Sequence, residues 1–194
     1  MSRPIIESWV AAGLAGETTN TPSGIFISDE ATHELANTKV IETIADIPRN
    51  VGDYLQRSPV FVARCRPETP RPTPETGPMG FNAQTAANGD WRGFDRWWTI
   101  SDRAEVGMRD IIQREGGMPF LVTVRGLVGF AAEIVEIHRE TDSRDVSFTL
   151  ANVNPWWAAP FAKSRLNAGG GPRSTFWPTF PTVNTSPFIA GKSS

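Results

Sequence analysis

One stretch decides the fold class, residues 102–153, which read DRAEVGMRDIIQREGGMPFLVTVRGLVGFAAEIVEIHRETDSRDVSFTLANV. Apolar residues recur at helical spacing in its first part, at Ala104, Met108, Ile111 and Ile112. Asp102, with Glu105 three residues later, resembles a capping box, and Gly116-Gly117 is a typical helix end. The pattern therefore predicts one amphipathic helix that begins at Asp102 and ends at Gly116.

Three strand-like runs follow this helix, at 119–125, 130–139 and 145–153. The loops between them are short, so consecutive strands should pair as antiparallel neighbours. Strict alternation along the second run places Ile134 on one face with Glu136 and His138, so that apolar and charged groups occur on both faces. This mixture predicts that one face packs on the core and the other meets a partner.

Upstream of this stretch, the run VFVARC at 60–65 predicts a strand that leads into a proline-rich segment at 67–78. Ser28-Asp29-Glu30 is a plausible helix start, and apolar positions continue from Leu35 to Ile47 before Pro48, which predicts a short helix. Turn signals occur at 20–24.

We therefore predict an α+β protein with a mainly antiparallel β-sheet, one or two helices and an extended C-terminal arm. The N-terminal region at 1–66 should contain a short helix and a strand, and a Pro-rich spacer or surface loop should follow at 67–90. Residues 91–153 should form a helix plus a three-stranded core, in the same domain as 1–66. An aromatic, Pro/Gly-rich arm should extend over 154–194.

Composition excludes several classes of protein. The 194 residues carry a net charge of −2, and the apolar runs are far shorter than the roughly 18 residues that a membrane span needs. The N-terminus lacks the pattern of a signal peptide, so we expect a soluble, non-secreted protein. A single cysteine, Cys65, and two histidines exclude an internal disulfide framework and an ordinary zinc site. No cofactor motif is present, and we expect none to be needed.

Large aromatic residues are in excess, with 7 Trp and 11 Phe but one Tyr. Aromatic residues are enriched at protein interfaces, and Trp also at their energetic centres, so we predict that these side chains anchor partners. The candidate interface residues are Trp91, Phe94, Trp97, Trp98, Trp156, Trp157, Phe161, Phe176, Trp177, Phe180 and Phe188. The arm at 154–194 either wraps its own domain or docks on a neighbouring subunit, and the sequence leaves both open.

A first alternative function is single-stranded nucleic-acid binding. The cluster WRGFDRWW at 91–98 interleaves tryptophans, which stack on bases, with Arg92 and Arg96, which contact phosphates. Asp90 and Asp95 offset that charge. The residues from 146 onward carry no acidic residue and a charge of +4, which is sparse for phosphate neutralisation and argues against a nucleic-acid partner.

A second alternative is a small hydrolase with Cys65 as nucleophile, His138 as base, and Asp142 or Asp145 as orienting residue. Cys65 ends a strand, however, and lacks the helix N-terminus that lowers a thiol pKa. Among the nearby carboxylates Glu133, Glu136 and Glu140, strand alternation sends Glu133 to the face opposite Glu136 and His138. These charges are therefore better explained as a charged sheet face or as ion pairs between subunits, with Arg139 and Arg125, and we predict no catalytic residues.

Residues 108–153 resemble the C-terminal part of the tail-completion protein U family of contractile-tailed bacteriophages. The likeness is carried by MPFLV at 118–122, the glycines Gly126 and Gly129, EIVEI at 133–137 and VSFTL at 146–150, and it covers about a quarter of the chain. Distal-tail and baseplate modules share this pattern. The resemblance implies a non-enzymatic subunit that forms a homo-oligomeric ring, binds other phage tail or baseplate proteins, and resides in the virion after assembly in the bacterial cytoplasm.

Overall fold

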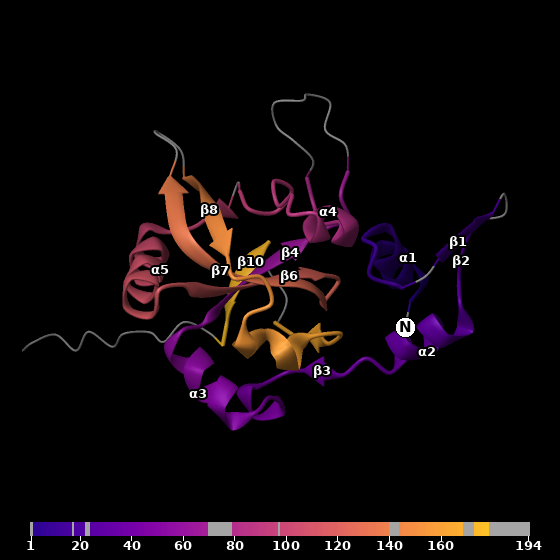
Figure 1. The fold of residues 1–194 in the computed structure, drawn as a ribbon, viewed down its shortest axis with the longest axis horizontal. Coiled ribbons are helices and arrows are strands. Elements are labelled where there is room, and N and C mark those ends of the chain that lie inside the picture. The colour runs from indigo at the N-terminus through magenta and orange to yellow at the C-terminus, as the bar shows by residue number, and fades with distance from the viewer. Residues whose placement is uncertain are drawn as a thin grey trace, which may run out of the picture.

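The structure is a computed structural model of the chain, and it describes residues 2–16, 18–21, 24–69, 79–96, 98–139, 144–168 and 173–178. It confirms the predicted α+β class, with helices packed on both faces of a mostly antiparallel sheet (Figure 1).

The main sheet has the strand order β10-β4-β6-β7-β8-β5, and β9 pairs with β7 and with β3. The strands are β3 (Val40–Ile41), β4 (Val60–Cys65), β5 (Trp98–Thr99), β6 (Met118–Val124), β7 (Leu127–Arg139), β8 (Asp145–Ala151), β9 (Arg165–Leu166) and β10 (Ser174–Trp177). The predicted strands at 60–65, 119–125, 130–139 and 145–153 correspond to β4, β6, β7 and β8, and the last three pair antiparallel, as predicted.

Two strand pairs depart from the antiparallel pattern, because β4 with β6 and β3 with β9 run parallel. Parallel neighbours need a crossover connection, and the described part of the one between β4 and β6 includes α4 (Ala83–Ala87) and α5 (Asp102–Glu115). The spacer predicted at 67–90 therefore contains a helix, and Phe81 within it is fully buried.

Helix α5 has the predicted length, but its cap is one residue earlier than predicted. The hydroxyl of Ser101, not the carboxylate of Asp102, accepts the backbone N–H of Ala104 at 3.2 Å. Glu105 is thereby left free for Arg109 and Arg139, which both donate to it. At the other end Gly116 is the C-cap in the left-handed region, with φ of 82°.

The alternation predicted for β7 is wrong after Ile134, because the pairing with β8 shifts register between Ile134 and Glu136. This bulge contains Val135, and it lets Ile134 and Ile137 both enter the same core. Glu136 therefore lies on the side away from that core, together with Glu133 and His138. Strict alternation had separated Glu133 from the other two.

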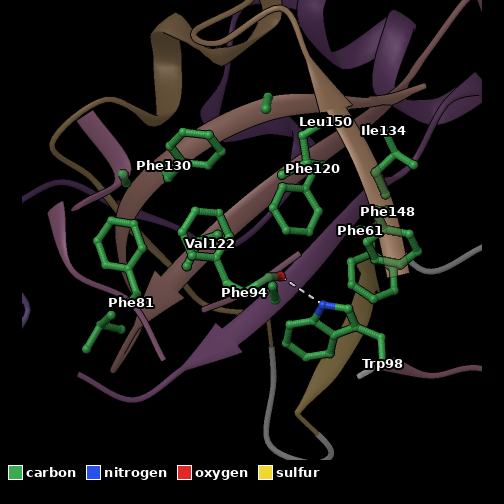
Figure 2. Packing of buried hydrophobic residues seen from close by; sticks show 14 of the residues in the cluster. Phe61, Phe81, Phe94, Trp98, Phe120, Val122, Phe130, Ile134, Phe148 and Leu150 are labelled. Atoms are coloured by element: carbon green, nitrogen blue, oxygen red, sulfur yellow. Dashed lines mark hydrogen bonds between the residues drawn. The ribbon is translucent and has the colours of Figure 1, made fainter. Parts of the chain in front are cut away.

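Two hydrophobic cores lie on opposite faces of the sheet, since alternate residues of β4 and β6 enter different clusters. The first core contains Phe61 and Phe120, and α1 (Arg3–Ala11), α4 and α5 cover it. Figure 2 shows its packed rings, among them Phe81, Phe94 and Phe148. The second core contains Leu121, and α3 (Arg49–Arg57) and the 3-10 helix η3 (Trp156–Phe161) cover it.

The N-terminal third is more helical than its sequence predicts. Helix α2 (Asp29–Ala36) begins where predicted and is capped by Ser28, but the residues after it form β3 and the short 3-10 helix η1 (Ile44–Asp46). Helices α1 and α3 were not predicted. Helix α1 is held by Trp9, which is fully buried and donates its indole N–H to the carbonyl of Val124 at 2.7 Å.

The described part of the predicted arm packs on its own domain. Within 154–168 and 173–178, η3 and Trp177 enter the second core, β9 pairs with β3 and β7, and β10 pairs antiparallel with β4. The sequence left open whether the arm wraps its own domain or docks on a neighbouring subunit. The described part of the arm wraps its own domain. Residues 179–194 lie outside the described residues.

Candidate protein interface

Most of the predicted interface aromatics are covered by the chain itself. Five of the eleven candidates are buried, and these are Phe94, Trp98, Trp157, Phe161 and Trp177. Trp91 and Phe176 are half-buried and pack against the first core. Trp97, Phe180 and Phe188 lie outside the residues whose side chains are described. While this fold is intact, a neighbouring subunit does not contact the five buried side chains.

The described residues of the WRGFDRWW cluster form part of the first core. Trp98 donates its indole N–H to the carbonyl of Phe94 at 2.9 Å, as Figure 2 shows. Trp91 donates to the carbonyl of Ala86 at 3.2 Å. The two arginines are paired with their neighbours, Arg92 with Asp90 at 2.7 Å and Arg96 with Asp95 at 2.8 Å. These rings and charges are therefore not arranged as a platform for single-stranded bases.

Trp156 is the exception among the predicted residues, since 57% of it is exposed. It begins η3, and its ring lies 5.1 Å from the ring of Tyr54 on α3. It also lines a cleft of about 1060 Å³ between α2 and η3, whose lining includes Leu14, Leu35 and Val128. An exposed Trp at the margin of an apolar cleft is the residue type that anchors protein contacts. We call Trp156, together with the cleft residues Leu14, Leu35 and Val128, the Trp156 surface.

A second exposed element is the hairpin of β1 (Thr18–Thr21) and β2 (Gly24–Ile27), which forms a two-stranded sheet of its own. Figure 1 shows it standing away from the main sheet, beside α2. Ile27 packs against the first core, whereas Phe26 is 56% exposed. The turn signals at 20–24 indicated a reversal here, but a polar run of four residues, TTNT, and an apolar run of four, GIFI, were too short to predict a hairpin.

The catalytic pair weighed for a hydrolase is not brought together. Cys65 on β4 is the register partner of Val124 on β6, and Val124 pairs with Leu127 at the start of β7. His138 lies near the other end of β7. At roughly 3.3 Å per residue, this places them on the order of 30 Å apart. Burial raises the pKa of the Cys65 thiol to about 12, although Arg173 opposes the rise. The thiol is therefore protonated and not nucleophilic at neutral pH.

The remaining candidate groups have structural partners in their own chain. His138 lies 2.7 Å from the hydroxyl of Thr149 and 3.6 Å from Glu136, and Asp145 accepts the hydroxyl of Thr99 at 2.6 Å. Asp142 and Glu140 lie outside the described residues. Arg139, weighed for an intersubunit ion pair, binds Glu105 of its own chain.

Glu133 accepts hydrogen bonds from Asn152 at 2.6 Å and from the indole of Trp157 at 3.3 Å. Glu133 thereby provides an acceptor for the indole N–H of Trp157 at the margin of the second core. Within the described part of the chain, no group of three or more His, Cys, Asp or Glu side chains is arranged to hold a metal ion.

None of the helices described has the length and hydropathy required to cross a bilayer. Comparison with protein-family models, with curated proteins and with solved structures finds no match to this chain.

Proposed function

We propose that this chain is a structural subunit of a bacteriophage tail or baseplate, a hub, adaptor or terminator that forms a ring with copies of itself and binds neighbouring tail proteins. The likeness of residues 108–153 to the protein U family supports the class of protein. The β1–β2 hairpin, which forms a sheet separate from the main one, is the observation that carries the mode of action. In this role the chain belongs to the virion and binds through surfaces, without catalytic residues.

The hairpin supports this role because it is incomplete as an isolated element. A two-stranded hairpin is only marginally stable in water. Among the described residues its two strands pair with each other and with no third strand, which leaves Phe26 on a surface that another chain can cover. Burying the exposed ring of Phe26 in such a contact would contribute roughly 1.5–3 kcal/mol.

The Trp156 surface supplies a second, different contact. A contact between two unlike surfaces repeats from subunit to subunit, and it closes into a ring when the rotation allows. We propose that the hairpin of one copy binds the Trp156 surface of the next. In this arrangement Trp156 is the residue of the arm at 154–194 that contacts a neighbour, whereas β10 and the buried rings of the arm pack on their own domain.

Two surface variants test this arrangement, Phe26→Ser and Trp156→Ser, with light scattering after size-exclusion chromatography as the measurement. We expect the wild type to form a defined oligomer, visible as rings by electron microscopy, and each variant to be monomeric. When the two variants are mixed, each retains one intact surface, so a 1:1 dimer that cannot grow should form.

Val106→Ser is the matched control, because Val106 is 59% exposed and lies on α5. It should assemble like the wild type. A wild-type chain that stays monomeric at high concentration would contradict self-assembly. Two monomeric variants that do not associate when mixed would contradict the contact between unlike surfaces.

A further inference from the structure

The two sides of the proposed ring contact differ in charge. Residues 18–30, which include the β1–β2 hairpin and the start of α2, contain two carboxylates and no Lys or Arg. Residues 154–168, which include η3 and β9, contain Lys163 and Arg165 and no Asp or Glu. One side of the contact is therefore acidic and the other is basic.

The two carboxylates, Asp29 and Glu30, directly follow the hairpin. β2 ends at Ile27, and Asp29 begins α2 after the Ser28 cap. Both acidic side chains are exposed. At about 3.3 Å per extended residue and about 1.5 Å per helical residue, Glu30 lies roughly 10 Å along the chain from Phe26. The hairpin side therefore presents an exposed aromatic ring with two negative charges nearby.

Two lysines, Lys39 and Lys163, line the same cleft as Trp156, and both are exposed. Lys163 follows η3, and at about 2 Å per residue of 3-10 helix it lies on the order of 10 Å from Trp156. The cleft side therefore presents an exposed aromatic ring with positive charge at a similar separation.

The contacts of these lysines within their own chain are weak or uncharged. The ammonium group of Lys39 donates to the backbone carbonyl of Asp46 at 2.5 Å. Lys163 lies 4.0 Å from Glu34, and the two side chains are 89% and 63% exposed. Ion pairs between such exposed side chains contribute little to stability. Both lysines can therefore bind a carboxylate of another chain without the loss of a strong internal ion pair.

This charge distribution favours contact between the two unlike surfaces over contact between two like ones. Two hairpins that faced each other would bring four carboxylates together, and two clefts that faced each other would bring four ammonium groups together. Like charges in contact oppose association and suppress wrong pairings. A contact of hairpin with cleft instead pairs opposite charges, and it repeats from subunit to subunit.

We propose that Asp29 and Glu30 of one copy bind Lys39 and Lys163 of the next. The inference rests on the proposed function and adds to it the charged residues that set the orientation of the contact. In this arrangement the exposed aromatic rings supply the buried area, and the charges exclude symmetric pairings of two hairpins or two clefts.

The 1:1 dimer expected from Phe26→Ser and Trp156→Ser isolates this contact from ring growth. The Trp156→Ser chain contributes the hairpin, so Asp29→Lys/Glu30→Lys is added to that chain as the acid reversal. The Phe26→Ser chain contributes the cleft, and it carries the opposite reversal. Analytical ultracentrifugation at constant ionic strength measures the dissociation constant of the dimer.

The opposite reversal, Lys39→Glu/Lys163→Glu, is the base reversal. We expect either reversal alone to raise the dissociation constant about 30-fold, because two ion pairs change from attraction to repulsion. The two reversals together should restore the constant to within about fivefold, because the pairs form again with opposite sign. Such a rescue requires both chains to be folded, so it separates a charge contact from damage to α2.

The matched control for the acid reversal is Asp102→Lys/Asp110→Lys, which changes the net charge equally at two exposed positions of α5. Figure 1 shows α5 at the opposite end of the molecule from the hairpin. Distant exposed charges are screened, so this control should change the dissociation constant by less than about threefold.

The outcomes separate this inference from the proposed function. A dimer that forms but is unaffected by either reversal would overturn the inference alone. So would a weakening that the second reversal does not rescue. If the chains without charge reversals form no dimer, both the ring contact and the inference that rests on it are wrong.

Discussion

At the scale of single residues, Glu105 is bound by two arginines from different elements. It accepts hydrogen bonds from Arg109 at 2.7 Å and from Nε of Arg139 at 2.7 Å, and it thereby ties α5 to β7. Partial burial tends to raise the pKa of Glu105, but the hydrogen bonds from the two arginines outweigh it and hold this pKa below its usual range.

We expect Glu105→Gln to lower the free energy of unfolding by about 1–3 kcal/mol at pH 7, because hydrogen bonds to a charged acceptor are lost. A lowered pKa in the folded state means that the contribution is present above the unfolded pKa and is lost as the pH falls through the folded value. The difference between wild type and variant should therefore shrink below about pH 4, as measured by urea unfolding.

The control for this prediction is Glu7→Gln, which breaks the exposed pair of Glu7 with Arg3. Exposed pairs contribute little, so this variant should change stability by less than about 0.5 kcal/mol. A pH-independent loss in Glu105→Gln would show that packing, not the carboxylate charge, accounts for the effect.

At the scale of elements, the start of α5 is where the structure differs from the sequence prediction, because the N-cap is Ser101 and not Asp102. We expect Ser101→Ala to destabilise the protein by about 1 kcal/mol, because the N-cap acceptor for Ala104 is lost. Asp102→Ala should cost less, since Asp102 is 98% exposed and lies 3.4 Å from an Arg139 that also binds Glu105. Thermal unfolding of both variants measures which substitution destabilises the protein more. A larger loss of stability in Asp102→Ala than in Ser101→Ala would place the cap at Asp102.

At the scale of the whole molecule, β10 completes both the sheet and the second core, although it follows the rest of the fold in sequence. A chain that ends at Ala168 lacks Phe176 and Trp177 and exposes the edge of β4. Loss of a buried Trp side chain alone costs about 3–5 kcal/mol, so we expect this truncation to unfold or aggregate.

A chain that ends at Pro178 is the matched truncation, because it keeps every element described here. It should retain the circular dichroism spectrum and the cooperative unfolding of the full chain. If both truncations fold equally well, β10 is not part of the stable domain.

Local sequence patterns determined the elements that depend on local physics. The helix from 102 to 115 and the strands β4, β6 and β8 follow from apolar spacing, from a glycine stop and from alternation, because those signals arise within one element. The bulge at Val135 was not predictable in this way, since it depends on how β7 pairs with β8.

The exposure of side chains and the meeting of distant residues depend instead on tertiary packing. The tryptophans looked like partner anchors because they are large and apolar, but packing placed Trp98, Trp157 and Trp177 inside and left Trp156 outside. One end of the sheet brings together residues from 64 to 173, because β4 pairs parallel with β6 and β10 pairs antiparallel with β4. The spacing of residues along the sequence does not show which distant strands pair. Composition does not show whether aromatic residues lie in the core or on the surface.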